Sequence, residues 1–145
     1  MKKQRILCAI LLWAILAFIW GNSLLPGEIS QAFSDWVKSL LLFGKTDAGQ
    51  GSGLLRKIAH FSEFTALGMC LLWRSRLLTK KGIHPFILGA GAACIDETIQ
   101  IFVPDRGPGL TDVLIDSSGV LTGIILLTLG YAYKERKNNT HLEEM

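Results

Sequence analysis

The chain has 145 residues and a formal net charge of +3, and half of its residues are hydrophobic. The hydrophobic residues form long blocks with most of the basic residues at their ends, so the positive charge gives no support for nucleic-acid binding. The three cysteines all fall within apolar segments, and an odd set in such positions argues against a disulfide framework.

The first block, residues 6–25, contains no charged residue and follows the basic start MKKQR. At ~1.5 Å per residue it is long enough to cross a bilayer core of ~30 Å. A cleaved signal peptide is the alternative, but the run is longer than the usual stretch of about 7–15 residues, and no small-x-small cleavage site follows. The block therefore predicts a retained transmembrane helix.

Residues 26–53 are predicted to form a long connection. Apolar side chains such as Ile29, Phe33, Trp36 and Val37 recur at nearly helical spacing, which indicates an amphipathic helix in the membrane interface. A partly ordered lid over a functional site is the alternative. The segment GKTDAGQGSG that follows, residues 44–53, is typical of a flexible linker.

Three more apolar blocks lie at about residues 54–73, 83–103 and 113–133, and the polar tail, residues 134–145, is expected to be disordered. Only helices and closed barrels satisfy the backbone in lipid, and no alternating pattern indicates a barrel. The predicted fold is an all-α membrane protein with four transmembrane helices in one domain, residues 1–133.

The lysines and arginines of the connections predict the orientation. They gather before the first block, between the second and third blocks, and after the fourth: Lys2, Lys3, Arg5, Arg74, Arg76, Lys80, Lys81, Lys134, Arg136 and Lys137. By the positive-inside rule, both termini are expected in the cytoplasm of a multi-pass cell-membrane protein.

This orientation places the ionisable residues of the spans in the outer half of the bilayer, densest between Ala92 and Gly119, whereas inner segments such as ILCAILLW contain none. A carboxylate at the centre of a membrane helix costs roughly 2.5–3.5 kcal/mol, so a chain that keeps several is expected to use them. The predicted site comprises Ser23, Lys57, His60, Asp96, Glu97, Gln100, Arg106, Asp112 and Asp116. Glu97 and Asp116 have no obvious cation of their own, which favours a bound ion, proton or ligand.

The residue types indicate roles. Lys57, His60 and Arg106 suit a phosphate headgroup. A buried Asp96 or Glu97 suits a general base, with His60 as the acid. The predicted catalytic set is His60, Asp96, Glu97 and Asp112, and the predicted substrate-binding set is Ser23, Lys57, Gln100, Arg106 and Asp116.

A divalent cation is a further prediction for this site. The carboxylates that would supply the oxygen ligands preferred by Mg²⁺ or Ca²⁺ are Asp96, Glu97, Asp112 and Asp116. Zinc bound by His60 with carboxylates is less favoured, because the chain has no HExxH motif and no cysteine pair of metal-site spacing.

Several short motifs run through the chain in a fixed order. They are Ser23 with Pro26, Lys57-x-x-His60, Asp96-Glu97-x-x-Gln100, Pro104-x-Arg106, and Asp112-x-x-x-Asp116-x-x-Gly119. Together they resemble the VanZ-like membrane protein family, over about residues 6–131. The chain departs from that pattern at Asp116, where Asn is more frequent, and at Phe64, where Tyr is expected. The resemblance implies an envelope-related role, and members of the family are linked to low-level resistance to teicoplanin, a lipoglycopeptide that binds cell-wall precursors.

Three functions fit this predicted site. The first is binding or modification of a lipid-linked, phosphate-bearing envelope substrate among the membrane lipids, and whether the protein is an enzyme stays open. The second is proton-coupled transport with Glu97, Asp96 and His60 as a relay, which would need a homo-oligomer because the inner half lacks a polar path. The third is a structural or partner-binding protein whose charges lock the helix register.

Overall fold

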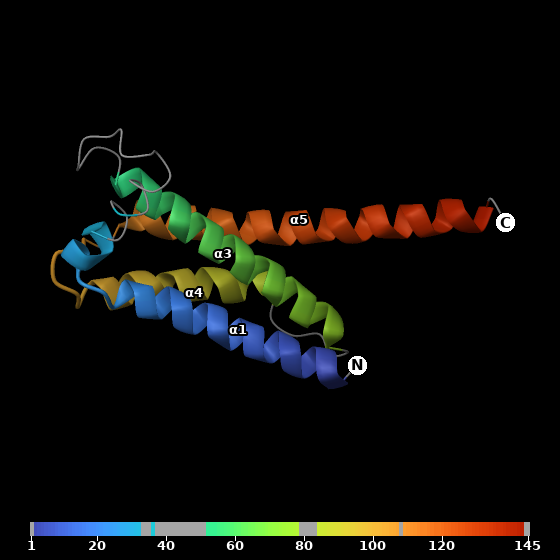
Figure 1. Ribbon diagram of the computed structural model, residues 1–145, viewed down its shortest axis with the longest axis horizontal. Helices are drawn as coiled ribbons and strands as arrows, with labels where there is room; N and C mark the ends of the chain where they lie inside the picture. Colours follow the sequence, from blue (N-terminus) through green and yellow to red (C-terminus); the bar gives the residue numbers. More distant parts are fainter. Residues whose placement is uncertain (1, 33–35, 37–51, 79–83, 108, 144–145) are drawn as a thin grey trace.

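The computed structural model describes residues 2–32, 36, 52–78, 84–107 and 109–143. Within these ranges the chain is helical and contains no strand, which confirms the all-α class (Figure 1). The long helices are α1 (Lys2–Ser23), α3 (Ser52–Leu77), α4 (Pro85–Gln100) and α5 (Leu110–Glu143). A short helical segment at 27–32 follows α1, so the start of the predicted interfacial helix is helical. Most of residues 33–51, including most of the predicted linker, lies outside the described residues, as do Lys80 and Lys81.

Helix α3 is the centre of the bundle. It packs along α5 and also contacts α1 and α4, while α4 lies against α5 and α1. Glycines allow the close approach of α3 and α5, because a Cβ added at Gly123 would collide with the main-chain oxygen of Thr65, and one at Gly119 would meet the main-chain oxygen of Phe61. In lipid there is no hydrophobic driving force between helices. They associate instead through the van der Waals packing that small residues at such contacts allow.

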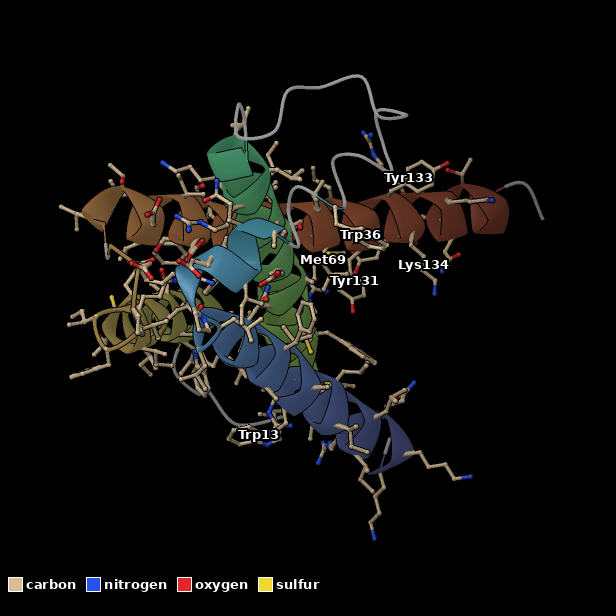
Figure 2. All side chains as sticks on the ribbon, turned by 60° about the vertical axis from the view of Figure 1, so that its left-hand side comes forward. Trp13, Trp36, Met69, Tyr131, Tyr133 and Lys134 are labelled. Atoms are coloured by element: carbon tan, nitrogen blue, oxygen red, sulfur yellow. The ribbon has the colours of Figure 1, made fainter. Side chains whose placement is uncertain are left out.

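The core between the helices is small and apolar. Its fully buried members are Ile19, Phe64, Leu67, Ala93 and Val120. By contrast, many large apolar side chains face outward, and Figure 2 shows Trp13 of α1 projecting away from the bundle, with 67% of its surface exposed. A bundle with an apolar exterior is typical of a protein surrounded by lipid. The cysteines are free thiols, with Cys8 and Cys70 buried and Cys94 exposed.

Among the described residues, two helical segments are long and apolar enough to cross a membrane, Lys2–Ser23 and Leu110–Thr140. They correspond to the first and last predicted spans. The predicted second and third spans form helices as well, but α3 carries several charges and α4 has only 16 residues. Helix α4 begins at Pro85, after His84 accepts the Phe86 N–H at 3.3 Å, and it stops at Gln100 because a turn at residues 101–105 follows. Crossing by these two helices stays a prediction.

The polar tail differs from its predicted disorder, because α5 continues without a break to Glu143. Residues after Gly130 include no glycine or proline, and most are good helix formers, so nothing interrupts the helix. The Thr140 hydroxyl donates to the main-chain oxygen of Arg136 at 3.0 Å within this tail. At ~1.5 Å per residue, α5 is longer than the thickness of a bilayer core. Its polar end extends beyond the other helices of the bundle (Figure 1).

The two ends of the bundle differ in character. Both termini lie at one end, where α3 also finishes (Figure 1). There the Arg76 guanidinium lies over the Tyr131 ring at 4.2 Å from its centroid, which joins the ends of α3 and α5. At the opposite end, the Gly27 N–H donates to the Pro104 carbonyl at 3.2 Å and connects the segment after α1 with the turn after α4. The polar residues gather at this opposite end.

Candidate functional site

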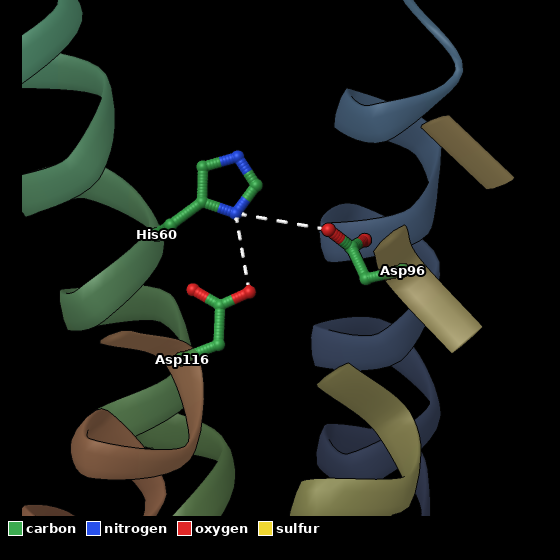
Figure 3. Close-up of side chains that lie close together, drawn as sticks. All are labelled: His60, Asp96 and Asp116. Atoms are coloured by element: carbon green, nitrogen blue, oxygen red, sulfur yellow. Dashed lines mark ion pairs between the residues drawn. The ribbon is translucent and has the colours of Figure 1, made fainter. Parts of the chain in front are cut away.

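The centre of the polar cluster is formed by His60 of α3, Asp96 of α4 and Asp116 of α5. The Nδ1 atom of His60 lies 3.8 Å from Oδ2 of Asp96 and 3.8 Å from Oδ2 of Asp116. Figure 3 shows this ring nitrogen facing both carboxylates, with the other ring nitrogen turned away from them. Each residue comes from a different helix, so the cluster forms only when α3, α4 and α5 pack together.

Both aspartates of this cluster are buried, with Asp96 at 0% and Asp116 at 1% exposure. Within the described part of the chain, neither oxygen of Asp116 has a hydrogen-bond partner, and Oδ1 of Asp96 has none. Unpartnered buried carboxylate oxygens are costly, because they lose water without gaining another donor. A donor or a cation placed at these oxygens would therefore be stabilised.

Gln100 extends the cluster to α1. Its Nε2 donates to Oδ2 of Asp96 at 2.9 Å and to Oγ of Ser23 at 3.3 Å. Gln100 lies one turn after Asp96 on the same face of α4, and Ser23 is the last residue of α1. The predicted residues Ser23 and Gln100 thus form a buried link that orients Asp96.

The remaining predicted carboxylates have partners of their own. Glu97 accepts the Gly109 N–H at 2.9 Å through Oε2, directly before α5 begins. Asp112 pairs with Lys57 at 3.5 Å, and this pair is partly exposed. Glu97 and Asp112 therefore lie in the same region as His60, Asp96 and Asp116 but face other groups. Glu97 and Asp116 were predicted to lack a cation of their own. Among the described residues Glu97 forms no ion pair, whereas Asp116 lies beside His60.

Arg106 is buried and turned toward the end of α1. Its Nη2 donates to the Asn22 carbonyl at 3.1 Å and its Nε to the Leu25 carbonyl at 3.3 Å, while Nη1 has no hydrogen-bond partner. Burial lowers the pKa of its guanidinium from the ordinary value, and the charge of Arg56 acts in the same direction. Because no substrate is present, the predicted substrate-binding role of Arg106 stays a prediction, beside an evident structural one.

Two hollows adjoin the cluster. A cavity of about 10 Å³, large enough for one water or ion, is lined by Arg56, Lys57, His60, Glu97, Gln100, Asp112, Ile115 and Asp116. A larger groove of about 340 Å³ runs between α1 and α3 and is lined by Phe18, Asn22, Leu25, Ser30, Leu55, Arg56, Ile58, Ala59, His60 and Glu63. The two hollows share Arg56 and His60.

Some residues of this region were not among the predicted site residues. Arg56 lines both hollows, and Glu63 accepts the Asn22 amide at 3.3 Å through Oε1, with Oε2 buried and unpartnered. Two of them have a signal in the sequence, because Arg56 precedes Lys57 and Glu63 follows His60 by one helical turn. Asn22 had a weaker signal, since its contact with Glu63 bridges 41 positions of the chain.

A comparison with known protein families identifies the family of the chain. The sequence model of the VanZ/LLP1 family matches residues 6–131, which include every residue of the cluster. No curated protein and no solved structure matches the chain. Because the family match covers most of the sequence, the resemblance expected from the motifs is confirmed, and the chain belongs to the VanZ/LLP1 family.

Proposed function

We propose that the protein is a multi-pass membrane protein that binds a lipid-linked, phosphate-bearing envelope substrate at the polar end of its bundle. Family membership and two long apolar helices indicate a membrane protein. The observation that carries the substrate proposal is the junction of the two hollows at Arg56 and His60. A polar cavity that opens beside an apolar groove suits an amphiphile with an anionic head.

The headgroup would be bound by the cations of the small cavity. Arg56 and Lys57 line it together with His60. An arginine can bind phosphate oxygens through two parallel N–H bonds, and a lysine acts as a point charge. Lys57 is already paired with Asp112, but its side chain is 44% exposed, so it can turn toward a ligand, and the buried Oδ1 of Asp112 would then lose its ion pair.

The acyl or prenyl chain would occupy the groove between α1 and α3. Phe18, Leu25, Leu55 and Ile58 provide its apolar walls. A volume of about 340 Å³ accommodates part of a hydrocarbon chain, with the rest of the chain remaining in the bilayer. Glu63 and Asn22 also line this groove and are hydrogen-bonded to each other, so they would contact part of the bound molecule.

The orientation proposed for this site is outward. The basic residues Lys2, Arg5, Arg74 and Arg76 belong to the ends of helices opposite the cluster, which supports cytoplasmic termini by the positive-inside rule. In that orientation all four long helices cross the membrane, and the cluster lies toward the outer leaflet. Catalytic roles for His60, Asp96, Glu97 and Asp112 remain predictions, because binding alone accounts for the arrangement.

Ligand-dependent thermal unfolding of the detergent-purified chain tests the proposal. With EDTA present to remove metal effects, a polyprenyl phosphate should raise the melting temperature, whereas the matching uncharged polyprenol should not. A ligand at a hundred times its dissociation constant stabilises the native state by ~2.7 kcal/mol. Arg56→Gln and Lys57→Met should abolish the shift, whereas Arg74→Gln at the opposite end should retain it.

The outcome separates binding from a structural lock. If neither ligand shifts the melting temperature and Arg56→Gln itself strongly destabilises the protein, the polar residues serve packing. A separate test concerns resistance, which is proposed here from the family resemblance alone. Expression of the wild-type chain in a teicoplanin-susceptible host should raise the inhibitory concentration of teicoplanin, and Lys57→Met should remove that increase.

A further inference from the structure

We propose that His60, Asp96 and Asp116 form a binding site for one divalent transition-metal ion, with Zn²⁺ as the preferred ion. One ligand atom from each residue can be chosen so that all three lie within 4.8 Å of one another. The proposal concerns a site that lies beside the proposed headgroup cavity, and it holds whether or not an amphiphile binds there.

The strongest support is the set of carboxylate oxygens without partners. Both oxygens of Asp116 and Oδ1 of Asp96 are buried and make no hydrogen bond. Two carboxylates in a buried position repel each other unless a cation or a proton lies between them. A divalent ion would satisfy these oxygens and neutralise both charges at once.

The side-chain cations of the region are directed elsewhere. Lys57 pairs with Asp112, and Arg106 donates to main-chain carbonyls at the end of α1. Within the described part of the chain, no lysine or arginine forms an ion pair with Asp96 or Asp116. Among the described residues, the His60 ring is thus the one ionisable partner of the two carboxylates. Its Nδ1 is itself a metal ligand when deprotonated.

The distances suit coordination after a small contraction. In a tetrahedral site with bonds of about 2.1 Å, neighbouring ligand atoms are about 3.4 Å apart. The observed separations from Nδ1 of His60 are 3.8 Å to each Oδ2. Side-chain movements of a few tenths of an ångström would bring each Oδ2 to that distance from Nδ1, and the chosen oxygens of Asp96 and Asp116 lie within 4.8 Å of each other. Gln100 would hold Asp96 in place, because it donates to Oδ2 at 2.9 Å.

The donor set selects among metals. An imidazole with two carboxylates suits zinc and other first-row ions, whereas Mg²⁺ and Ca²⁺ take oxygen ligands almost entirely. The sequence had instead favoured Mg²⁺ or Ca²⁺ held by four carboxylates. Of those four, Glu97 and Asp112 have partners outside the cluster, so the structure leaves two carboxylates and one histidine.

The fourth coordination position would be open to the small cavity. Both His60 and Asp116 line that cavity, whose volume of about 10 Å³ holds one water. Three protein ligands with an open position are the usual arrangement of reactive zinc sites, whereas structural sites have four protein ligands. A bound ion would therefore face the mouth of the cavity, where the cations proposed to bind the headgroup lie.

Metal analysis of the full-length chain tests this proposal. The protein is purified in detergent without a polyhistidine tag, stripped with EDTA, incubated with Zn²⁺, Mn²⁺, Mg²⁺ or Ca²⁺, and desalted before elemental analysis and thermal unfolding. The expected result is one zinc ion retained per chain and a rise in melting temperature with zinc. Absence of both from the wild-type protein overturns the proposal, whatever the variants do.

Three variants locate the ion. Asp116→Asn and His60→Gln should each lose the bound zinc and the zinc-dependent shift. Asp105→Asn removes an exposed carboxylate at the same end of the bundle and should retain both. Zinc binding that survives Asp116→Asn and His60→Gln assigns the ion to other residues and contradicts the proposed site.

A comparison without metal separates a ligand role from a structural one. In EDTA, Asp116→Asn should be at least as stable as the wild type, because it removes one of two buried carboxylate charges that share the His60 ring and keeps the side-chain shape. After zinc is added, the order should reverse, since only the wild type gains stability. An Asp116→Asn protein that is less stable in both conditions by the same amount would assign Asp116 to packing and overturn the proposal.

Discussion

Arg106 donates a hydrogen bond from Nη2 to the main-chain oxygen of Asn22 at 3.1 Å, across 84 positions of the chain. Its Nε adds a second bond to the Leu25 oxygen at 3.3 Å. The last carbonyls of a helix have no intrahelical donor and carry the negative end of the helix dipole. The loop between α4 and α5 thereby supplies the C-terminal cap of α1 and determines where Asn22 and Ser23 lie beside the polar cluster.

Replacing Arg106 should therefore weaken the fold. Buried hydrogen bonds from a charged group contribute about 1.5–3 kcal/mol, and the compact ammonium of a lysine lacks the two separated N–H donors, Nε and Nη2, of the guanidinium. We expect Arg106→Lys and Arg106→Ala to lower the melting temperature in detergent, with Ala the more severe. The control is Arg136→Lys in the exposed end of α5, which should have no effect. An unchanged melting temperature with lost polyprenyl phosphate binding would instead favour the substrate role.

The contact of α3 with α5 depends on glycine at position 123. A methyl group there would overlap the main-chain oxygen of Thr65 and approach the Met69 nitrogen to 2.9 Å. Because both are backbone atoms, the helices must move apart, and we expect Gly123→Ala to cost about 1–3 kcal/mol of stability. Thermal unfolding in detergent measures this loss.

Gly130, on the same helix, gives a matched control. Nothing lies within 4 Å of a Cβ added there, so Gly130→Ala should stabilise the protein by about 0.5–1 kcal/mol through its better helix propensity. Equal effects of the two substitutions would mean that α3 and α5 do not pack as described.

Glu97 supports the start of α5. Its Oε2 accepts the N–H of Gly109, the residue directly before the helix, as a capping glutamate does. We expect Glu97→Ala to cost about 0.5–2 kcal/mol, the range for loss of an N-terminal cap. Glu97→Gln keeps an acceptor oxygen and should cost less. Amide exchange at Gly109 and in the first turn of α5 measures this locally, and faster exchange in Glu97→Gln than in Glu97→Ala would contradict the capping role.

Much of the site could be predicted from the sequence because the constraints are severe in lipid. Hydrophobic blocks locate the helices, and the cost of a buried charge draws attention to the region of the polar cluster. The i,i+4 spacing of Asp96 and Gln100 likewise predicted a shared face, and the structure joins them by a hydrogen bond of 2.9 Å. Patterns of this kind involve residues that are close in the sequence, so they can be recognised before the fold is known.

The pairing of charges could not be predicted in the same way. Whether His60 lies beside Asp96, Asp116 or Glu97 depends on the rotation of three helices, which is set by packing at Gly119 and Gly123. Arg106 shows the same limit, since its partners are main-chain carbonyls that no side-chain pattern marks. The helical tail beyond Lys134 was missed because a polar composition describes solvation and not backbone propensity.

The number of membrane crossings determines on which side Leu78 lies, directly after α3. If α1, α3, α4 and α5 all cross, the Leu78 side chain is cytoplasmic, whereas if only α1 and α5 cross, it is outside. We expect a single cysteine at Leu78, which is 43% exposed, to be protected from a membrane-impermeant maleimide in intact cells and labelled after lysis. Each single cysteine is introduced into a chain in which Cys8, Cys70 and Cys94 are replaced by alanine. Glu28→Cys serves as the control outside the membrane, and Lys134→Cys serves as the cytoplasmic control. Labelling at Leu78 in intact cells would reduce the protein to two spans, because α3 and α4 would then both lie outside the membrane.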